Sequence, residues 1–141
     1  MRSVLRGYGI ASSLEWWATQ RSRHLLFISA EVLRELTTPG FRHGDAALRL
    51  IEGVASLAFD EDVLGLASLL VAERVMPGPA AGGDAMHVAV ATAHRVEYLL
   101  SWNVRHLANP NKLVHLRRVC LRAGLVPPQI ITPDLLWEST P

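Results

Sequence analysis

The most informative stretch of the chain runs from Gly83 to Ala108 and reads GDAMHVAVATAHRVEYLLSWNVRHLA. Its first half is mostly small or apolar, which is typical of a helix packed closely against a sheet. Asp84 follows two glycines and is the expected N-cap of that helix. Residues 98–102 then predict a short buried strand. A helix followed by a buried strand is the alternation expected of an α/β protein.

Two polar side chains bracket this unit. Asp84 stands at the start of the helix, and Asn103 stands at the end of the following strand. In an open α/β sheet, ligands collect at the carboxyl ends of strands and at the adjacent helix starts. The sequence therefore predicts that Asp84 and Asn103 share one cleft.

The rest of the chain continues the alternation within a single domain, residues 1–141. A Pro- and Gly-rich segment at 77–83 predicts a loop. Strands that alternate with helices favour a parallel sheet with right-handed crossovers. We expect helices at 12–23, 30–37, 43–52, 61–75 and 110–123, and strands at 25–29, 54–58 and 130–131.

The quoted stretch resembles the PIN-domain nucleases, in particular the VapC-type toxins of bacterial and archaeal toxin-antitoxin pairs. The segment from Asp84 to His87 resembles the helix start of that family. Ser101, Trp102 and Asn103, with His106 three residues later, resemble the strand end of one subgroup.

Two further blocks extend the resemblance to residues 15–138. The run FISAEVLREL, from Phe27 to Leu36, resembles the family's strand-into-helix segment that ends in a catalytic Glu. Glu35 falls on that position. The run PPQIITP, residues 127–133, resembles the last strand of the subgroup.

The resemblance implies a three-layer PIN-like fold with a central parallel sheet. It also implies a metal-dependent endoribonuclease that uses Mg²⁺ or Mn²⁺, cleaves RNA and is inhibited by a cognate antitoxin. Catalytic and metal-binding roles would fall to Glu35, Asp84 and Asn103, and substrate contacts to Ser101, Arg105 and His106. Oxygen ligands of this kind suit hard divalent cations.

One departure concerns the beginning of the chain. The family's first strand carries an acidic metal ligand, whereas the first acidic residue here is Glu15. The resemblance therefore implies a missing or altered first strand and an impaired nuclease, and residues 3–5 or a second copy of the chain are expected to cover the defect. The alternative is a non-catalytic PIN-like protein that retains antitoxin or partner binding.

Each candidate residue also has a purely structural interpretation. Asp84 could act only as a helix cap, Glu35 could be a solvated surface charge, and Asn103 could cap a turn. His87 is expected to be a packed or hydrogen-bonded helix residue. Asp84, His87 and His94 share a helical spacing, but the absence of a second recognisable ligand block argues against a tetrahedral zinc site.

Composition narrows the class of protein. The net charge is +1, so any nucleic-acid footprint must be local, and half of the residues are hydrophobic, which argues against disorder. The lone Cys120 is expected in the core. No long apolar run predicts a membrane span, and a cytoplasmic protein is expected. A small-molecule or other α/β binding module has only the fold in its favour.

Overall fold

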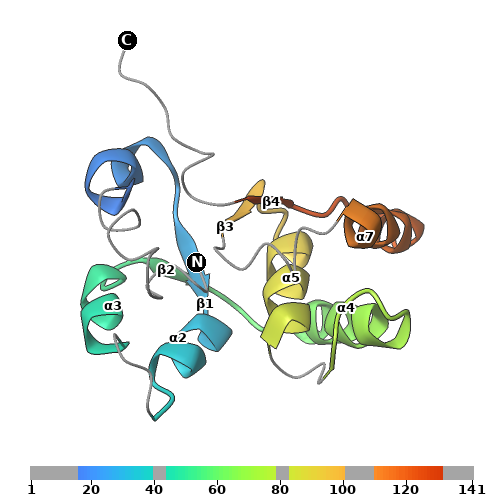
Figure 1. Ribbon diagram of the computed structural model, residues 1–141, viewed down its shortest axis with the longest axis horizontal. Helices are drawn as coiled ribbons and strands as arrows, with labels where there is room; N and C mark the ends of the chain where they lie inside the picture. The colour runs from blue at the N-terminus through green and yellow to red at the C-terminus, as the bar shows by residue number, and fades with distance from the viewer. Residues whose placement is uncertain (1–15, 40–43, 79–82, 101–109, 132–141) are drawn as a thin grey trace.

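The computed structural model describes residues 16–39, 44–78, 83–100 and 110–131 (Figure 1). Residues 16–20 are helical and lead into the 3₁₀-helix η1. The elements, in chain order, are η1 (Arg21–Arg23), β1 (Phe27–Ser29), α2 (Ala30–Leu36), α3 (Gly44–Leu50), β2 (Ala55–Leu57), α4 (Glu61–Ala72), α5 (Gly83–Ala93), β3 (Tyr98–Leu100), α7 (Pro110–Arg122) and β4 (Gln129–Ile131). This alternation confirms the mixed α/β class.

The strands pair in parallel, as expected when helices connect them. β1 pairs with β2, with Phe27 opposite Ala55, and β3 pairs with β4, with Tyr98 opposite Gln129. Among the described residues these are two separate two-stranded sheets. The parallel pairing is thus confirmed, whereas one central sheet in a three-layer fold stays a prediction.

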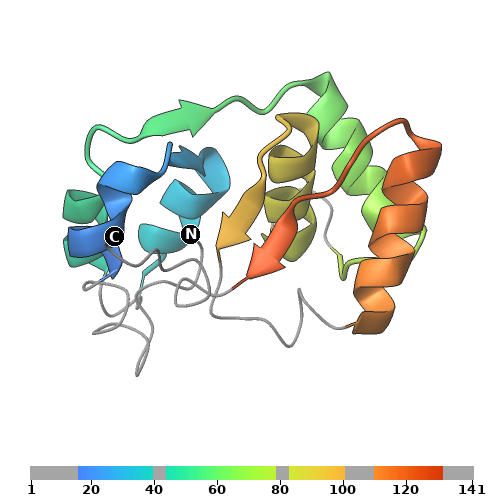
Figure 2. The same ribbon diagram turned by 90° about the horizontal axis from the view of Figure 1, so that it is seen from above.

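Helix α4 is stabilised by an N-cap at its first turn and by an apolar face that it buries. The Asp60 carboxylate accepts a hydrogen bond from the backbone N–H of Val63 at 2.9 Å, which satisfies one free donor of the first turn. The residues that α4 buries are Val63, Leu66, Ala67 and Leu70. Their spacing of three and four residues is that of one helical face, and this face packs on α5. Figures 1 and 2 show the two helices side by side.

Helix α5 is buried on almost every side. All residues from Asp84 to Thr92 are buried, and Ala85 and Ala89 are fully so, which allows neighbouring elements to approach closely. The helix begins at Gly83, whose φ is +65°. Asp84 is therefore the second residue of the helix and lies inside its first turn, so its assignment as the N-cap was wrong.

Two apolar clusters form the core. The larger joins α4, α5 and α7 with β3 and β4, and includes the fully buried Cys120. The smaller surrounds β1 and α2 and includes Trp16 and Trp17. None of the described helices is both long and apolar enough to cross a membrane.

Candidate functional site

Two helices present polar side chains to each other at the edge of the two cores. Helix α2 starts directly at the end of β1, and its 3.6-residue period places Glu31 and Glu35 on one face. Helix α5 contacts α2 and carries Asp84 and His87 one turn apart in its first two turns. Helical spacing therefore places the two carboxylates of α2, and Asp84 and His87 of α5, where the two helices meet.

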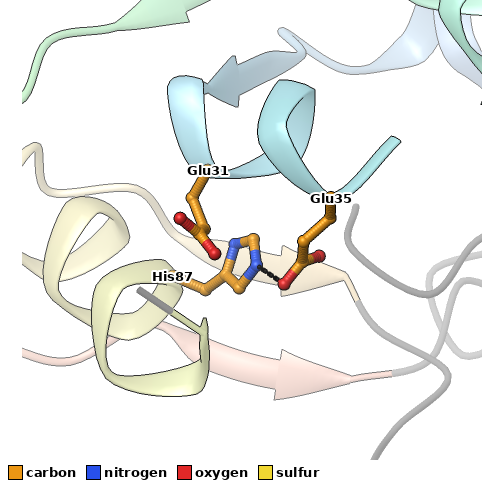
Figure 3. Close-up of side chains that lie close together, drawn as sticks. All are labelled: Glu31, Glu35 and His87. Carbon is orange, nitrogen blue, oxygen red and sulfur yellow. Dashed lines mark hydrogen bonds and ion pairs between the residues drawn. The ribbon is translucent and has the colours of Figure 1, made fainter. Parts of the chain in front are cut away.

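The side chains of Glu31, Glu35 and His87 meet there, and they are called the carboxylate–imidazole group below. Nε2 of His87 lies 3.0 Å from Oε1 of Glu35. One ligand atom from each of the three residues lies within 4.8 Å of the others. Figure 3 shows the imidazole between the two carboxylates. Such a group can share a proton or bind a divalent cation.

Glu31 is the most buried carboxylate of the group, with 2% of its side chain exposed. Its Oε2 accepts a hydrogen bond from Nε of Arg34 at 2.9 Å, and its Oε1 accepts from Nη2 of Arg34 and, at 2.9 Å, from the backbone N–H of Gly83. Burial alone would raise the pKa of Glu31. The hydrogen bonds from Arg34 and Gly83, with the charges of Arg34 and His87, outweigh burial and hold its pKa below the usual value.

Asp84 is buried in the first turn of α5, next to Gly83, whose backbone N–H donates to Glu31. The structure therefore brings the start of α5, with Asp84, against α2, which carries Glu35. The other predicted site residues lie outside the described part of the chain: Ser101, Asn103, Arg105 and His106.

A cavity of about 390 Å³ adjoins His87. Its walls come from β1 and the residues before it, from β3 and from α5, and Ser29 and His87 both line it. The hydroxyl of Ser29 is buried and has no hydrogen-bond partner in the described part of the protein. A buried polar atom without a partner commonly marks a place where a water molecule or a ligand belongs.

Sequence reasoning missed Glu31. The available signal was its spacing of four residues from Glu35, but an acidic residue on a short helix is usually exposed. The expectation that His87 is a packed, hydrogen-bonded residue is confirmed. A zinc site was not expected because the sequence shows no second group of metal ligands. The structure contains such a group, because α2 supplies two carboxylates beside His87. His94 does not join them, because its Nε2 bonds the carbonyl oxygen of Ala58 at 2.8 Å.

Comparisons with known proteins give no independent assignment: no family model, no curated protein and no solved structure matches this chain.

Proposed function

We propose that this protein is a metal-dependent endoribonuclease of the PIN-domain type, and the toxin of a VapC-like toxin-antitoxin pair. Glu35 and Asp84 would hold Mg²⁺ or Mn²⁺, and Asn103 would orient a bound water or the scissile phosphate. The proposal carries with it the three-layer family fold, in which both strand pairs belong to one sheet. RNA is the proposed substrate and a cognate antitoxin the proposed partner.

The observation that carries the proposal is the contact between Glu35 and the start of α5. His87, one turn after Asp84, lies 3.0 Å from Glu35. Residues three apart on a helix face the same way, so Asp84 shares the side of α5 that meets α2. Had Glu35 and Asp84 lain on opposite faces of the molecule, the two could not serve one ion.

The residues present fit a divalent cation. Two carboxylates of α2 lie beside His87, and Asp84 is buried one turn before His87 on α5. Carboxylate oxygens are ligands that such ions prefer. A bound ion would polarise a phosphoryl oxygen and lower the pKa of a bound water. Ser101, Arg105 and His106 would contact the phosphate, as the resemblance implies. With only two carboxylates at family-matching positions, we expect slow cleavage.

One observation favours the non-catalytic alternative. The chain already provides partners for the carboxylates of α2, because Arg34 binds Glu31 through two nitrogens and the His87 ring contacts Glu35. Carboxylates that are paired in this way need no metal ion. In that case the protein would act only by binding its antitoxin or another partner.

An RNA cleavage assay with Mn²⁺ separates the two. We expect Asp84→Asn and Glu35→Gln to abolish cleavage, since each removes a charge that holds the ion. Asp45→Asn and Glu52→Gln are matched controls, because both residues are exposed and lie on or after α3, away from the group. Their activity should equal that of the unchanged protein.

The outcomes are distinct. Cleavage that survives Asp84→Asn would come from a contaminant or another site, and would end the proposal. No cleavage by the unchanged chain, together with tight binding of a partner protein, would favour the non-catalytic alternative.

A further inference from the structure

The donor atoms of the carboxylate–imidazole group have the spacing of metal ligands. Two ligands about 2.1 Å from one ion lie about 3.0 Å apart at right angles and about 4.2 Å apart on opposite sides. Nε2 of His87 and Oε1 of Glu35 lie 3.0 Å apart, and the donor of Glu31 lies within 4.8 Å of both. Small side-chain rotations would therefore place all three around one ion.

The group also includes a nitrogen donor, which matters for the choice of ion. Imidazole nitrogen is a good ligand for first-row transition metals, whereas Mg²⁺ prefers oxygen ligands and water. Catalytic zinc sites commonly combine three protein ligands from His and carboxylates with an open position for water. Glu31, Glu35 and His87 supply such a set, and they come from two helices that are packed together.

Space for the remaining ligands lies next to His87. The 390 Å³ cavity is large enough for several water molecules, and Ser29 lines it together with His87. The buried Ser29 hydroxyl, which has no partner among the described residues, could accept or donate to a metal-bound water. This second feature points to a ligand independently of the two carboxylates.

Both carboxylate oxygens of Glu31 accept hydrogen bonds from Arg34, so an ion that binds Glu31 has to compete with this guanidinium. Its side chain is 62% exposed, while that of Glu31 is 2% exposed. A buried carboxylate needs a cationic partner, and a guanidinium with most of its surface in water can leave and be solvated at little cost. Arg34 is therefore placed as an exchangeable cation rather than as a fixed part of the core.

We infer that Glu31, Glu35 and His87 bind a first-row transition-metal ion such as Zn²⁺ or Mn²⁺ in preference to Mg²⁺, and that Arg34 is the internal competitor that releases Glu31 when the ion binds. The role of the ion in cleavage rests on the proposed function, whereas the site itself rests on the geometry of α2 and α5.

The test is a calorimetric titration of the full chain with Co²⁺, Mn²⁺ and Mg²⁺, with the visible absorption of Co²⁺ as a second readout of its ligands. His87→Gln should lower Co²⁺ affinity by about tenfold or more and leave Mg²⁺ affinity within about twofold, because only the nitrogen donor is lost. Glu31→Gln should also weaken Co²⁺ binding. His115→Gln is the matched control and should bind like the unchanged protein, because His115 lies on α7, bonds the carbonyl oxygen of Glu73 and does not line the cavity.

Arg34→Gln gives the sharper test, because it predicts a gain. Removing the competitor should raise Co²⁺ affinity several-fold, because the buried carboxylate of Glu31 then has no other cationic side chain bonded to it and gains more from the ion. A purely structural role for the Glu31–Arg34 pair predicts no gain. Unchanged or weaker Co²⁺ binding in Arg34→Gln, or equal Co²⁺ binding in His87→Gln and the unchanged chain, would overturn the inference.

Different experimental results would contradict the inferred metal site and the proposed nuclease activity. Co²⁺ binding that follows the expected order, without RNA cleavage, supports the site and removes the nuclease. RNA cleavage that Mg²⁺ supports equally well in the unchanged chain and in His87→Gln keeps the nuclease and removes the inferred site.

Discussion

Helix α5 packs against both α4 and α2, and these two contacts differ in kind. On the α4 side, the buried apolar residues of both helices belong to the larger cluster. Against α2, helix α5 meets the carboxylate–imidazole group, while the apolar residues of α2 belong to the smaller cluster. Apolar burial scales with area and stabilises the fold, whereas buried charges cost desolvation. We therefore expect the α4 contact to contribute most of the stability, and the α2 contact to hold the polar groups on which the proposed metal site depends.

The largest effect is expected on the α4 side. Leu70→Ala should lower the free energy of unfolding by about 3 kcal/mol, because Leu70 is fully buried and its loss leaves a cavity. Leu64→Ala, on the same helix but 48% exposed, should cost far less. Urea unfolding of both variants measures the difference. Equal costs would mean that the packed face of α4 has been wrongly assigned.

Disrupting the contact between α5 and α2 should lower the free energy of unfolding less than disrupting the contact between α5 and α4. Glu31→Ala should destabilise by about 2 kcal/mol at pH 7, because Gly83 and Arg34 both lose a buried charged acceptor. Glu31→Gln should cost less, since its amide oxygen can still accept from the Gly83 N–H. Chemical unfolding at pH 7 provides the comparison. A larger loss for Gln than for Ala would contradict the hydrogen-bond account.

Low pH should remove the stabilisation that the charged Glu31 side chain provides. The pKa of Glu31 is lower in the folded protein than its ordinary value of 4.5, so its charged form stabilises the fold at pH values above that ordinary value. This stability is lost as the pH falls through the folded pKa. The difference in unfolding free energy between the unchanged chain and Glu31→Gln should thus be constant from pH 7 to about pH 5 and shrink below it. Growth of that difference on acidification would refute the assignment.

Removing the N-cap of α4 should have a smaller and more local effect on stability. Asp60→Ala should cost about 1 kcal/mol, because the backbone N–H of Val63 loses its cap. Asp62→Ala, in the first turn of the same helix, is the matched control, since it lacks this capping role. The thermal unfolding midpoint of each variant gives the comparison. If both variants melted alike, the cap would contribute nothing beyond charge near the helix start.

The smallest effect is expected at the surface of the α4 side. Glu73 and Arg122 form an ion pair at 3.5 Å, and their side chains are 40% and 61% exposed. Glu73→Gln should change the unfolding free energy by no more than about 0.5 kcal/mol, because solvent and salt screen such pairs. Denaturation at low and high salt checks this. A larger, salt-insensitive loss would mean that this pair is part of the core contact.

Local sequence patterns predicted most of the helices and strands. The helix expected at 61–75 begins at the first residue of α4 and ends three residues too late, and the helix expected at 110–123 matches α7 to within one residue of its observed end. The boundary at α5 was displaced because the helix uses the positive φ of Gly83 for its first residue, and the sequence placed this glycine in the preceding loop.

The candidate site was predictable only in part. Glu35 and Asp84 came from the family resemblance, and their helices are indeed in contact. The bond between Glu35 and His87 joins residues 52 positions apart, and no local pattern encodes such a contact. Glu31 was missed for the same reason, because its burial depends on α5 lying over α2.

By itself, the sequence determined which segments are helices and strands, because periodicity, caps and turn residues act within a few positions of the chain. It also determined the class of donor atoms available, since carboxylates and imidazole are properties of the residues. Only the tertiary structure decided which of these donors share a site. Packing of α5 between α4 and α2 fixes the distances among Glu31, Glu35 and His87, and metal affinity depends on those distances.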